Sequence, residues 1–137
     1  MNILFHLITK DKVAYINEDA TLRQAMEKME HHRYTAVPVI SEEGKYVGVL
    51  REGDILWYIK NEGSFAMEEL ERIRIDKLPR KKDHKHVSID ANIDELIELS
   101  IDQNFIPVTD DRESFIGIIT RKSIITYLVK NFKNKRK

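Results

Sequence analysis

The pattern of apolar and polar positions along this chain occurs twice. Each copy has a short apolar run, apolar residues at helical spacing, two β-rich runs around a polar turn, and a second helical pattern. An offset of 69 residues superposes Pro38 on Pro107, Gly48 on Gly117 and Tyr58 on Tyr127. Because a unit of this size buries its apolar face poorly alone, the repetition predicts two similar parts that complete one fold.

The first copy predicts the order strand, helix, strand, strand, helix. Thr21 with Gln24 three residues later is a capping box, which marks a helix start. The helix that follows has an apolar stripe of Leu22, Ala25, Met26 and Met29. Strands are expected at 13–16, 35–40 and 46–50, and the closing helix from Arg51.

The second copy repeats these signals. Asn92 with Glu95 predicts the first helix, whose face is Ile93, Leu96, Ile97 and Ser100. Strands are expected at 87–89, 105–108 and 115–119, and the closing helix from Arg121. Between the copies, Met67, Leu70, Ile73 and Ile75 indicate a helical piece that Pro79 ends.

The predicted fold class is α/β, with two β-α-β-β-α repeats related by pseudo-twofold symmetry. The expected boundaries are 10–61 for the first repeat, 62–86 for a linker with a short helix, 87–132 for the second repeat and 133–137 for a basic tail.

Composition fits a soluble domain with a real core. The chain has 137 residues, of which 42% are hydrophobic and 34% charged. No apolar run reaches membrane-spanning length and no signal peptide is visible, so no membrane partner is expected. The absence of cysteine excludes disulfides and thiolate metal sites, and is compatible with a cytoplasmic location.

Charge is balanced overall but unevenly placed. Residues 1–70 hold 8 basic and 12 acidic residues, and residues 71–137 hold 15 basic and 11 acidic residues. The basic excess lies in the linker and the tail: Arg80, Lys81, Lys82, Lys85, Lys130, Lys133, Lys135, Arg136 and Lys137. Solvated segments are the more usual reason for such runs, and a nucleic-acid-binding surface is the alternative.

Two segments carry a family resemblance, "YTAVPVI…EEGKYVGVLREGDIL" and "NFIPVTDDRESFIGIITRKSII". They resemble a pair of CBS domains (a Bateman module), the regulatory module that binds adenine nucleotides, over residues 10–132. The resemblance implies a nucleotide cleft between the two repeats of a stand-alone sensor. "DKVAYI", "YTAVPVI" and "FIGIITRKSII" are similar to small bacterial CBS-pair proteins that sense cyclic di-AMP.

That closer resemblance implies a nucleotide site built from both repeats. Its Thr-Arg-Arg segment is Thr-Arg-Lys here, and Lys122 keeps the charge but loses a bidentate fork. The implied nucleotide-binding residues are Lys12, Ala14, Tyr34, Thr35, Ala36, Pro38, Ile118, Thr120, Arg121 and Lys122. Tyr34 either stacks on a base or packs in the core.

The family usually places a phosphate-binding hydroxyl three residues before a ribose-binding acid. The first copy has Arg51 and Asp54 at these positions, and Arg51 can equally pair with Asp54, so this second site is expected to be weaker. The other copy has Thr120 and Ser123. Cations and helix N–H groups beside Thr120 favour phosphate, and a ligand with two phosphates depends less on the missing acid. The expected ligand is cyclic di-AMP or AMP, ADP or ATP.

Other chemistry is not indicated. His31 and His32 are adjacent, and His84 and His86 have no acidic partner at ligand spacing, so no metal is expected. No nucleophile–base set or phosphate loop stands out, and the chain is expected to be no enzyme. Trp57 and Tyr58 favour a homodimer face. The predicted function is a regulatory module that has no cofactor beyond its nucleotide ligand and signals to an unidentified partner protein.

Overall fold

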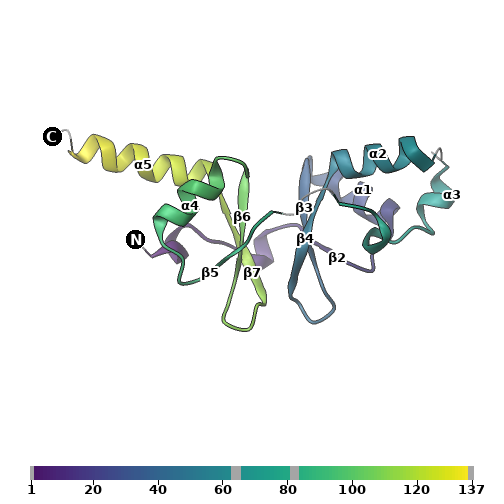
Figure 1. Cartoon of the computed structure of the whole chain (residues 1–137), viewed down its shortest axis with the longest axis horizontal. Coiled ribbons are helices and arrows are strands. Elements are labelled where there is room, and N and C mark those ends of the chain that lie inside the picture. Colours follow the sequence, from purple (N-terminus) through teal and green to yellow (C-terminus); the bar gives the residue numbers. More distant parts are fainter. Residues whose placement is uncertain (1, 63–65, 81–83, 136–137) are drawn as a thin grey trace. The chain divides into compact units, whose positions relative to one another are not determined.

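The computed structural model describes residues 2–62, 66–80 and 84–135. Lys81 and Lys82 of the predicted linker, and Arg136 and Lys137 of the predicted tail, lie outside the described residues. The chain divides into two compact units, drawn together in Figure 1. The first-repeat unit is Ala14–Asp83; the second-repeat unit is Met1–Val13 with His84–Lys137.

The first-repeat unit is a three-stranded sheet with helices. Its strands are β2 (Ile16–Asn17), β3 (Ala36–Ile40) and β4 (Tyr46–Arg51), in the order β2-β3-β4. Its helices are α1 (Leu22–His32), α2 (Glu52–Glu62), α3 (Met67–Leu70) and the 3-10 turn η3 (Ile75–Lys77). Strand β2 is parallel to β3, and β3 and β4 form an antiparallel hairpin. Its core includes Leu22, Ala25, Met29, Val37, Val39, Leu50, Ile55 and Ile59.

The second-repeat unit repeats this plan and adds a strand. Its sheet order is β1-β7-β6-β5, from β1 (Ile8–Thr9), β5 (Val87–Ser88), β6 (Phe105–Thr109) and β7 (Phe115–Thr120). Its helices are α4 (Ile93–Ser100), α5 (Arg121–Lys135), and the 3-10 turns η1 (Ile3–His6) and η2 (Lys10–Lys12). The predicted α/β class with two similar β-α-β-β-α repeats is confirmed. Its core includes Ile3, Val87, Leu96, Ile106, Val108, Ile119 and Ile124.

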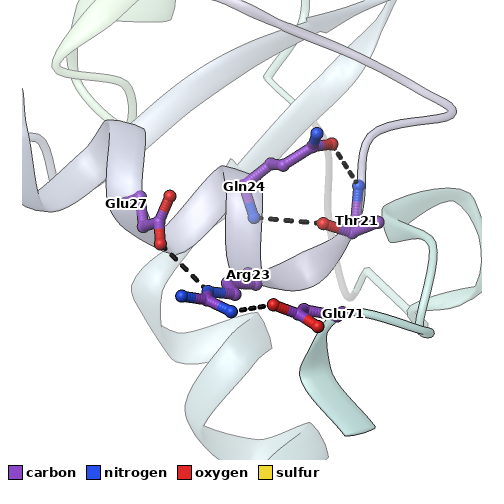
Figure 2. A network of polar contacts seen from close by, with 5 residues as sticks. All are labelled: Thr21, Arg23, Gln24, Glu27 and Glu71. Carbon is purple, nitrogen blue, oxygen red and sulfur yellow. Dashed lines mark hydrogen bonds and ion pairs between the residues drawn. The ribbon is translucent and has the colours of Figure 1, made fainter. Parts of the chain in front are cut away.

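The predicted helix starts are confirmed at the caps. The Thr21 hydroxyl accepts from the Gln24 backbone N–H at 3.2 Å, and the Gln24 side chain accepts from the Thr21 N–H at 3.0 Å (Figure 2). Arg23 on the same helix forms ion pairs with Glu27, at 3.0 Å, and with Glu71, which follows α3. In the other unit, Asn92 accepts from the Glu95 N–H at 3.0 Å. Local sequence therefore fixes where both helices begin.

Two predicted elements differ in extent. The run at 13–16 is a strand only from Ile16, because β2 spans Ile16–Asn17. The predicted linker helix is wrong beyond Leu70: Ile73 and Ile75 do not continue α3. Instead the Ile73 oxygen accepts from the Leu22 N–H at 2.7 Å, and the Ile75 N–H donates to Ala20 at 2.9 Å. Arg74 between them is extended and forms an antiparallel bridge with Thr21, so the helix is interrupted before the turn η3 begins at Ile75.

Equivalent hydrogen bonds in the two repeats join the first residue of the closing helix to the residue that precedes the hairpin. The Glu52 N–H donates to the Thr35 oxygen at 2.9 Å, and the Arg121 N–H donates to the Asn104 oxygen at 2.9 Å. Both hairpins also shift register at the same place, between Val39 and Ile40 and between Val108 and Thr109. The 69-residue offset is thus a structural equivalence.

The N-terminal arm, residues 2–13, packs on the second repeat. Strand β1 pairs antiparallel with β7, with Ile8 opposite Ile118 and Thr9 opposite Gly117. Gly117 has φ +154°, and a Cβ there would lie 2.1 Å from the Ile8 oxygen. Only glycine lets β1 approach β7 this closely. The sequence boundary at residue 10 therefore cuts through a segment that belongs to the second-repeat unit.

Candidate functional site

Thr120 is the last residue of β7 and directly precedes α5, as predicted. Its hydroxyl accepts from the Ser123 N–H at 3.2 Å, and the Ser123 hydroxyl donates to the Thr120 oxygen at 2.9 Å. Thr120 is thus the cap of α5, the helix whose N-terminus was expected to bind phosphate. A phosphate at this position would receive helix N–H groups and the partial positive charge of the helix end.

Arg121 begins α5 but its side chain reaches another element. Its Nε atom donates to the Ser100 oxygen at 2.7 Å, at the end of α4. The bond places a cation at a helix C-terminus, where it is favourable. Because Nε is used here, any phosphate contact from Arg121 must come from its terminal amino groups.

Thr120 and Lys122 lie in one pocket of about 540 Å³ within the second-repeat unit. Its remaining lining comes from the N-terminal arm and from α5. The lining residues are His6, Thr120, Lys122, Ser123, Thr126, Tyr127 and Lys130. Among these described residues there are two lysines and one histidine and no acid, so the pocket suits an anion with hydroxyl contacts.

Sequence reasoning placed Ser123 beside Thr120 but did not assign the other lining residues of this pocket: His6, Thr126, Tyr127 and Lys130. Ser123, Tyr127 and Lys130 share one face of α5 at helical spacing, a signal that was available from the sequence. His6 comes from the arm and meets the Tyr127 ring edge-on, with centroids 5.3 Å apart. No local pattern links His6 to α5, because the contact depends on where the arm packs.

Tyr34 and Thr35 lie in a separate pocket of the first-repeat unit, of about 360 Å³. Its other lining residues are Met26, Met29, Glu30, Arg33, Glu52 and Ile55. Tyr34 is 38% exposed, so it is not a core residue. Ala36 is half-buried at the start of β3, and Pro38 is buried within that strand, opposite Val49.

Asp54 has a local structural role in the first repeat. Its carboxylate accepts from the Arg51 backbone N–H at 3.0 Å, which caps the start of α2. The two repeats therefore cap equivalent helices differently: an acid at the third helical position in one, a hydroxyl at the preceding cap in the other. Asp54 therefore acts as a helix cap, and the weaker nucleotide site at Arg51 and Asp54 stays a prediction.

Lys12, Ala14 and Ile118 complete the predicted set. Lys12 is exposed on η2, and Ile118 is half-buried on β7; both belong to the second-repeat unit. Ala14 is half-buried and begins the first-repeat unit. Beside Lys12, a hydrogen bond from the Thr9 hydroxyl lowers the pKa of Asp11, so this carboxylate stays anionic near the lysine.

The predicted residues are thus divided between the units. Lys12, Ile118, Thr120, Arg121 and Lys122 belong to one, and of these Thr120 and Lys122 share a pocket. The others belong to the first-repeat unit, where Tyr34 and Thr35 share a pocket: Ala14, Tyr34, Thr35, Ala36, Pro38, Arg51 and Asp54.

His84 is a structural residue. It is 6% exposed, its ring lies 4.7 Å from that of Phe105, and its Nε2 lies 3.4 Å from Asn104 Oδ1. In the parts of the chain that the structure describes, no three His, Cys, Asp or Glu side chains gather as a metal would require. None of the helices in those parts has the length and apolar character to cross a bilayer.

Known proteins share this architecture. Cyclic di-AMP receptor B of Bacillus subtilis (strain 168) is 25% identical over 131 residues, 96% of this chain and 88% of that protein. The structure of CbpB in complex with c-di-AMP superposes with a TM-score of 0.82 at 28% identity, over 98% of this chain and 91% of that one. A CBS domain protein from Streptococcus pneumoniae TIGR4 gives a TM-score of 0.82 at 28% identity, over 94% and 87%.

The family comparison covers both repeats. The model of the CBS domain matches residues 6–61 and again residues 75–130. Each match contains one hairpin and most of the closing helix that follows it. With two matched copies over most of its length, this chain belongs to the CBS domain family.

Proposed function

We propose that this protein is a regulatory nucleotide sensor that binds cyclic di-AMP in the pocket lined by Thr120 and Lys122. The observation that carries the proposal is the lining of that pocket: Lys122, Lys130 and His6 around the capped N-terminus of α5. Cations, hydroxyls and a helix N-terminus together are the groups that hold phosphates in proteins. Similarity to a cyclic di-AMP receptor over 96% of the chain supports the same ligand.

The residue at position 123 favours cyclic di-AMP over AMP, ADP or ATP. A mononucleotide presents a ribose diol, which a carboxylate binds well, and Ser123 offers only a neutral hydroxyl that already donates to Thr120. A cyclic dinucleotide relies on two phosphodiesters, and the pocket carries two lysines to meet them. Its volume of about 540 Å³ falls within the usual range for ligand pockets.

The sensor is proposed to act as a homodimer in the cytoplasm, without catalysis of its own. Apolar side chains are exposed on α2 and α5, including Leu56 at 57%, Trp57 at 55% and Phe132 at 61%. Tyr58, the other aromatic residue predicted for this face, is half-buried and packs against the core, so Trp57 is the more exposed of the two. An exposed apolar surface of this kind fits a second copy or the regulated protein.

Calorimetry with the full chain tests the ligand. Cyclic di-AMP is expected to bind at micromolar or lower concentration and more tightly than AMP, ADP or ATP. Cyclic di-GMP, which has the same backbone and different bases, is the control for base recognition. Absence of heat with every adenine nucleotide up to millimolar concentration would refute the proposal.

Nucleic acid binding is the competing outcome. It would appear as binding to DNA or RNA that weakens steeply with salt and disappears when the lysines at 130, 133 and 135 are replaced. Lys130 lies in the same pocket, so Lys133 and Lys135 are the discriminating positions. Under the sensor proposal, replacing these two leaves cyclic di-AMP affinity unchanged.

A further inference from the structure

The N-terminal arm is held on its unit by a short strand and a few apolar side chains. Two residue pairs join β1 to β7, Ile3 and Val13 are buried, and Leu7 packs against the unit's core. The middle of η1 faces outward, with Leu4 46% and Phe5 86% exposed. A segment with so short a ladder opens more easily than the central strands β6 and β7.

His6 ends η1 and is the arm residue that lines the pocket. Its ring meets Tyr127 of α5 edge-on, with centroids 5.3 Å apart, and it lines the same pocket as Ser123 and Lys130. An imidazole N–H donates to a phosphate oxygen, and a protonated imidazole adds a positive charge.

We propose that His6 binds a phosphate of the nucleotide together with Lys122 and Lys130, so that ligand binding fastens the N-terminal arm onto α5. This inference rests on the proposed function. It adds one residue that contacts the ligand and one segment, the N-terminal arm, whose docking depends on the ligand. The site is then formed only when the arm is docked. A ligand that binds only the docked form stabilises that form by mass action.

The consequence is a ligand-dependent surface. When η1 is docked, Leu4 and Phe5 are presented at a fixed place beside the pocket. At a ligand concentration 100 times the Kd, opening of the arm is suppressed about 100-fold. A partner protein that reads Leu4 and Phe5 would therefore distinguish the bound and free forms.

Hydrogen exchange on the full chain tests this directly, with cyclic di-AMP as the probe. Residues 3–9 are expected to exchange about 100-fold more slowly at saturating ligand, and His6→Ala is expected to weaken binding about 10-fold. His31→Ala is the matched control, because His31 is an exposed histidine on α1 of the first-repeat unit. It should change neither quantity.

A conservative variant separates ligand contact from a purely structural role. The polar side chains that line the pocket with His6 include Lys122, Tyr127 and Lys130. His6→Gln keeps an N–H donor that can reach a phosphate oxygen, so it should retain more of the cyclic di-AMP affinity than His6→Ala when both are measured by calorimetry.

The outcomes separate the two proposals. If no adenine nucleotide binds the unaltered chain, the proposed function fails and the arm has no ligand to respond to. If cyclic di-AMP binds, but His6→Ala and His6→Gln bind equally well and exchange in residues 3–9 is unchanged by ligand, the proposed function stands and the role of His6 is overturned.

Discussion

The Nε atom of Arg121 donates a 2.7 Å hydrogen bond to the backbone oxygen of Ser100. The bond joins the first residue of α5 to the last residue of α4. It satisfies a carbonyl at a helix end, where intrahelical donors run out. Arg121 therefore has a packing role inside its unit as well as the nucleotide-binding role that the family resemblance implies.

Replacing Arg121 with alanine is expected to affect stability and binding together. Loss of a half-exposed, charge-assisted bond should lower the free energy of unfolding by about 1 kcal/mol. Cyclic di-AMP affinity should fall at least 10-fold, as judged by calorimetry at a temperature where the variant is folded. Arg121→Lys keeps the charge and loses the planar fork. Lower stability with unchanged affinity in both variants would leave only the packing role.

Thr120→Ala should destabilise the chain by about 1 kcal/mol in urea denaturation, because α5 loses its hydroxyl cap. It should also weaken cyclic di-AMP binding, and Thr120→Ser should restore both. Asp54→Ala is the matched control, since it removes the equivalent cap of α2. It should lower stability similarly and leave ligand affinity intact; a parallel loss of affinity in the control would mean that helix capping alone explains the Thr120 result.

Ser123→Asp is expected to change ligand preference. A carboxylate at this position would accept from a ribose diol and would repel a nearby phosphodiester. AMP affinity should therefore rise relative to cyclic di-AMP affinity, measured by competition on one preparation. An unaltered ratio would place residue 123 outside the ligand contacts. Ser41→Asp, in the hairpin turn of the first repeat, controls for the added charge.

Gly117→Ala should displace the N-terminal arm. The added Cβ would lie 2.1 Å from the Ile8 oxygen at a φ of +154°, which L side chains rarely adopt. Strain of this kind is expected to lower stability by about 1–3 kcal/mol. Hydrogen exchange should be faster in residues 3–9 than in the unaltered chain. Unchanged exchange there would show that β1 tolerates the substitution without moving.

Asp11 offers a local pH test. The Thr9 hydroxyl lowers the pKa of Asp11, with smaller contributions from its own backbone N–H and from Lys12. A lowered folded-state pKa contributes stability above the unfolded-state pKa and loses it as pH falls through the folded-state value. Thr9→Val should therefore raise the Asp11 pKa toward its ordinary value, as followed by NMR titration of the carboxyl carbon. An unshifted titration would exclude Thr9 as the cause.

Sequence patterns predicted the elements whose signals are local. The caps at Thr21 and Asn92 and both hairpins follow from residues within a few positions of one another. The predicted linker helix does not extend to Ile73. Backbone hydrogen bonds with residues 20–22, about 50 positions earlier in the chain, outweigh the helical spacing of the apolar residues there. Periodicity describes neighbours and contains no information on such distant pairs.

For the candidate site, too, sequence patterns predicted the residues that lie close together in the chain and missed the contacts between distant segments. Thr120 and Lys122 were placed at a strand-to-helix junction from the repeat itself, and they share a pocket. The Arg121 bond to Ser100 and the approach of His6 to Tyr127 join segments separated by 21 and 121 positions, and neither follows from a motif. The additional groups in the pocket depend on tertiary packing of the arm.

The packing of the arm also changes what counts as one repeat. Residues 6–13 lie in the first family match but complete the second-repeat unit, and residues 75–80 lie in the second match but pack in the first-repeat unit. Neither match is self-contained, so a chain cut between the two matches, before residue 75, leaves each half without a segment that the other half carries. Separately produced halves should recover structure on mixing, as in fragment complementation. A chain with a single repeat would have to take its arm from a second copy to complete its sheet, as domain-swapped pairs do, whereas the tandem chain supplies the arm covalently.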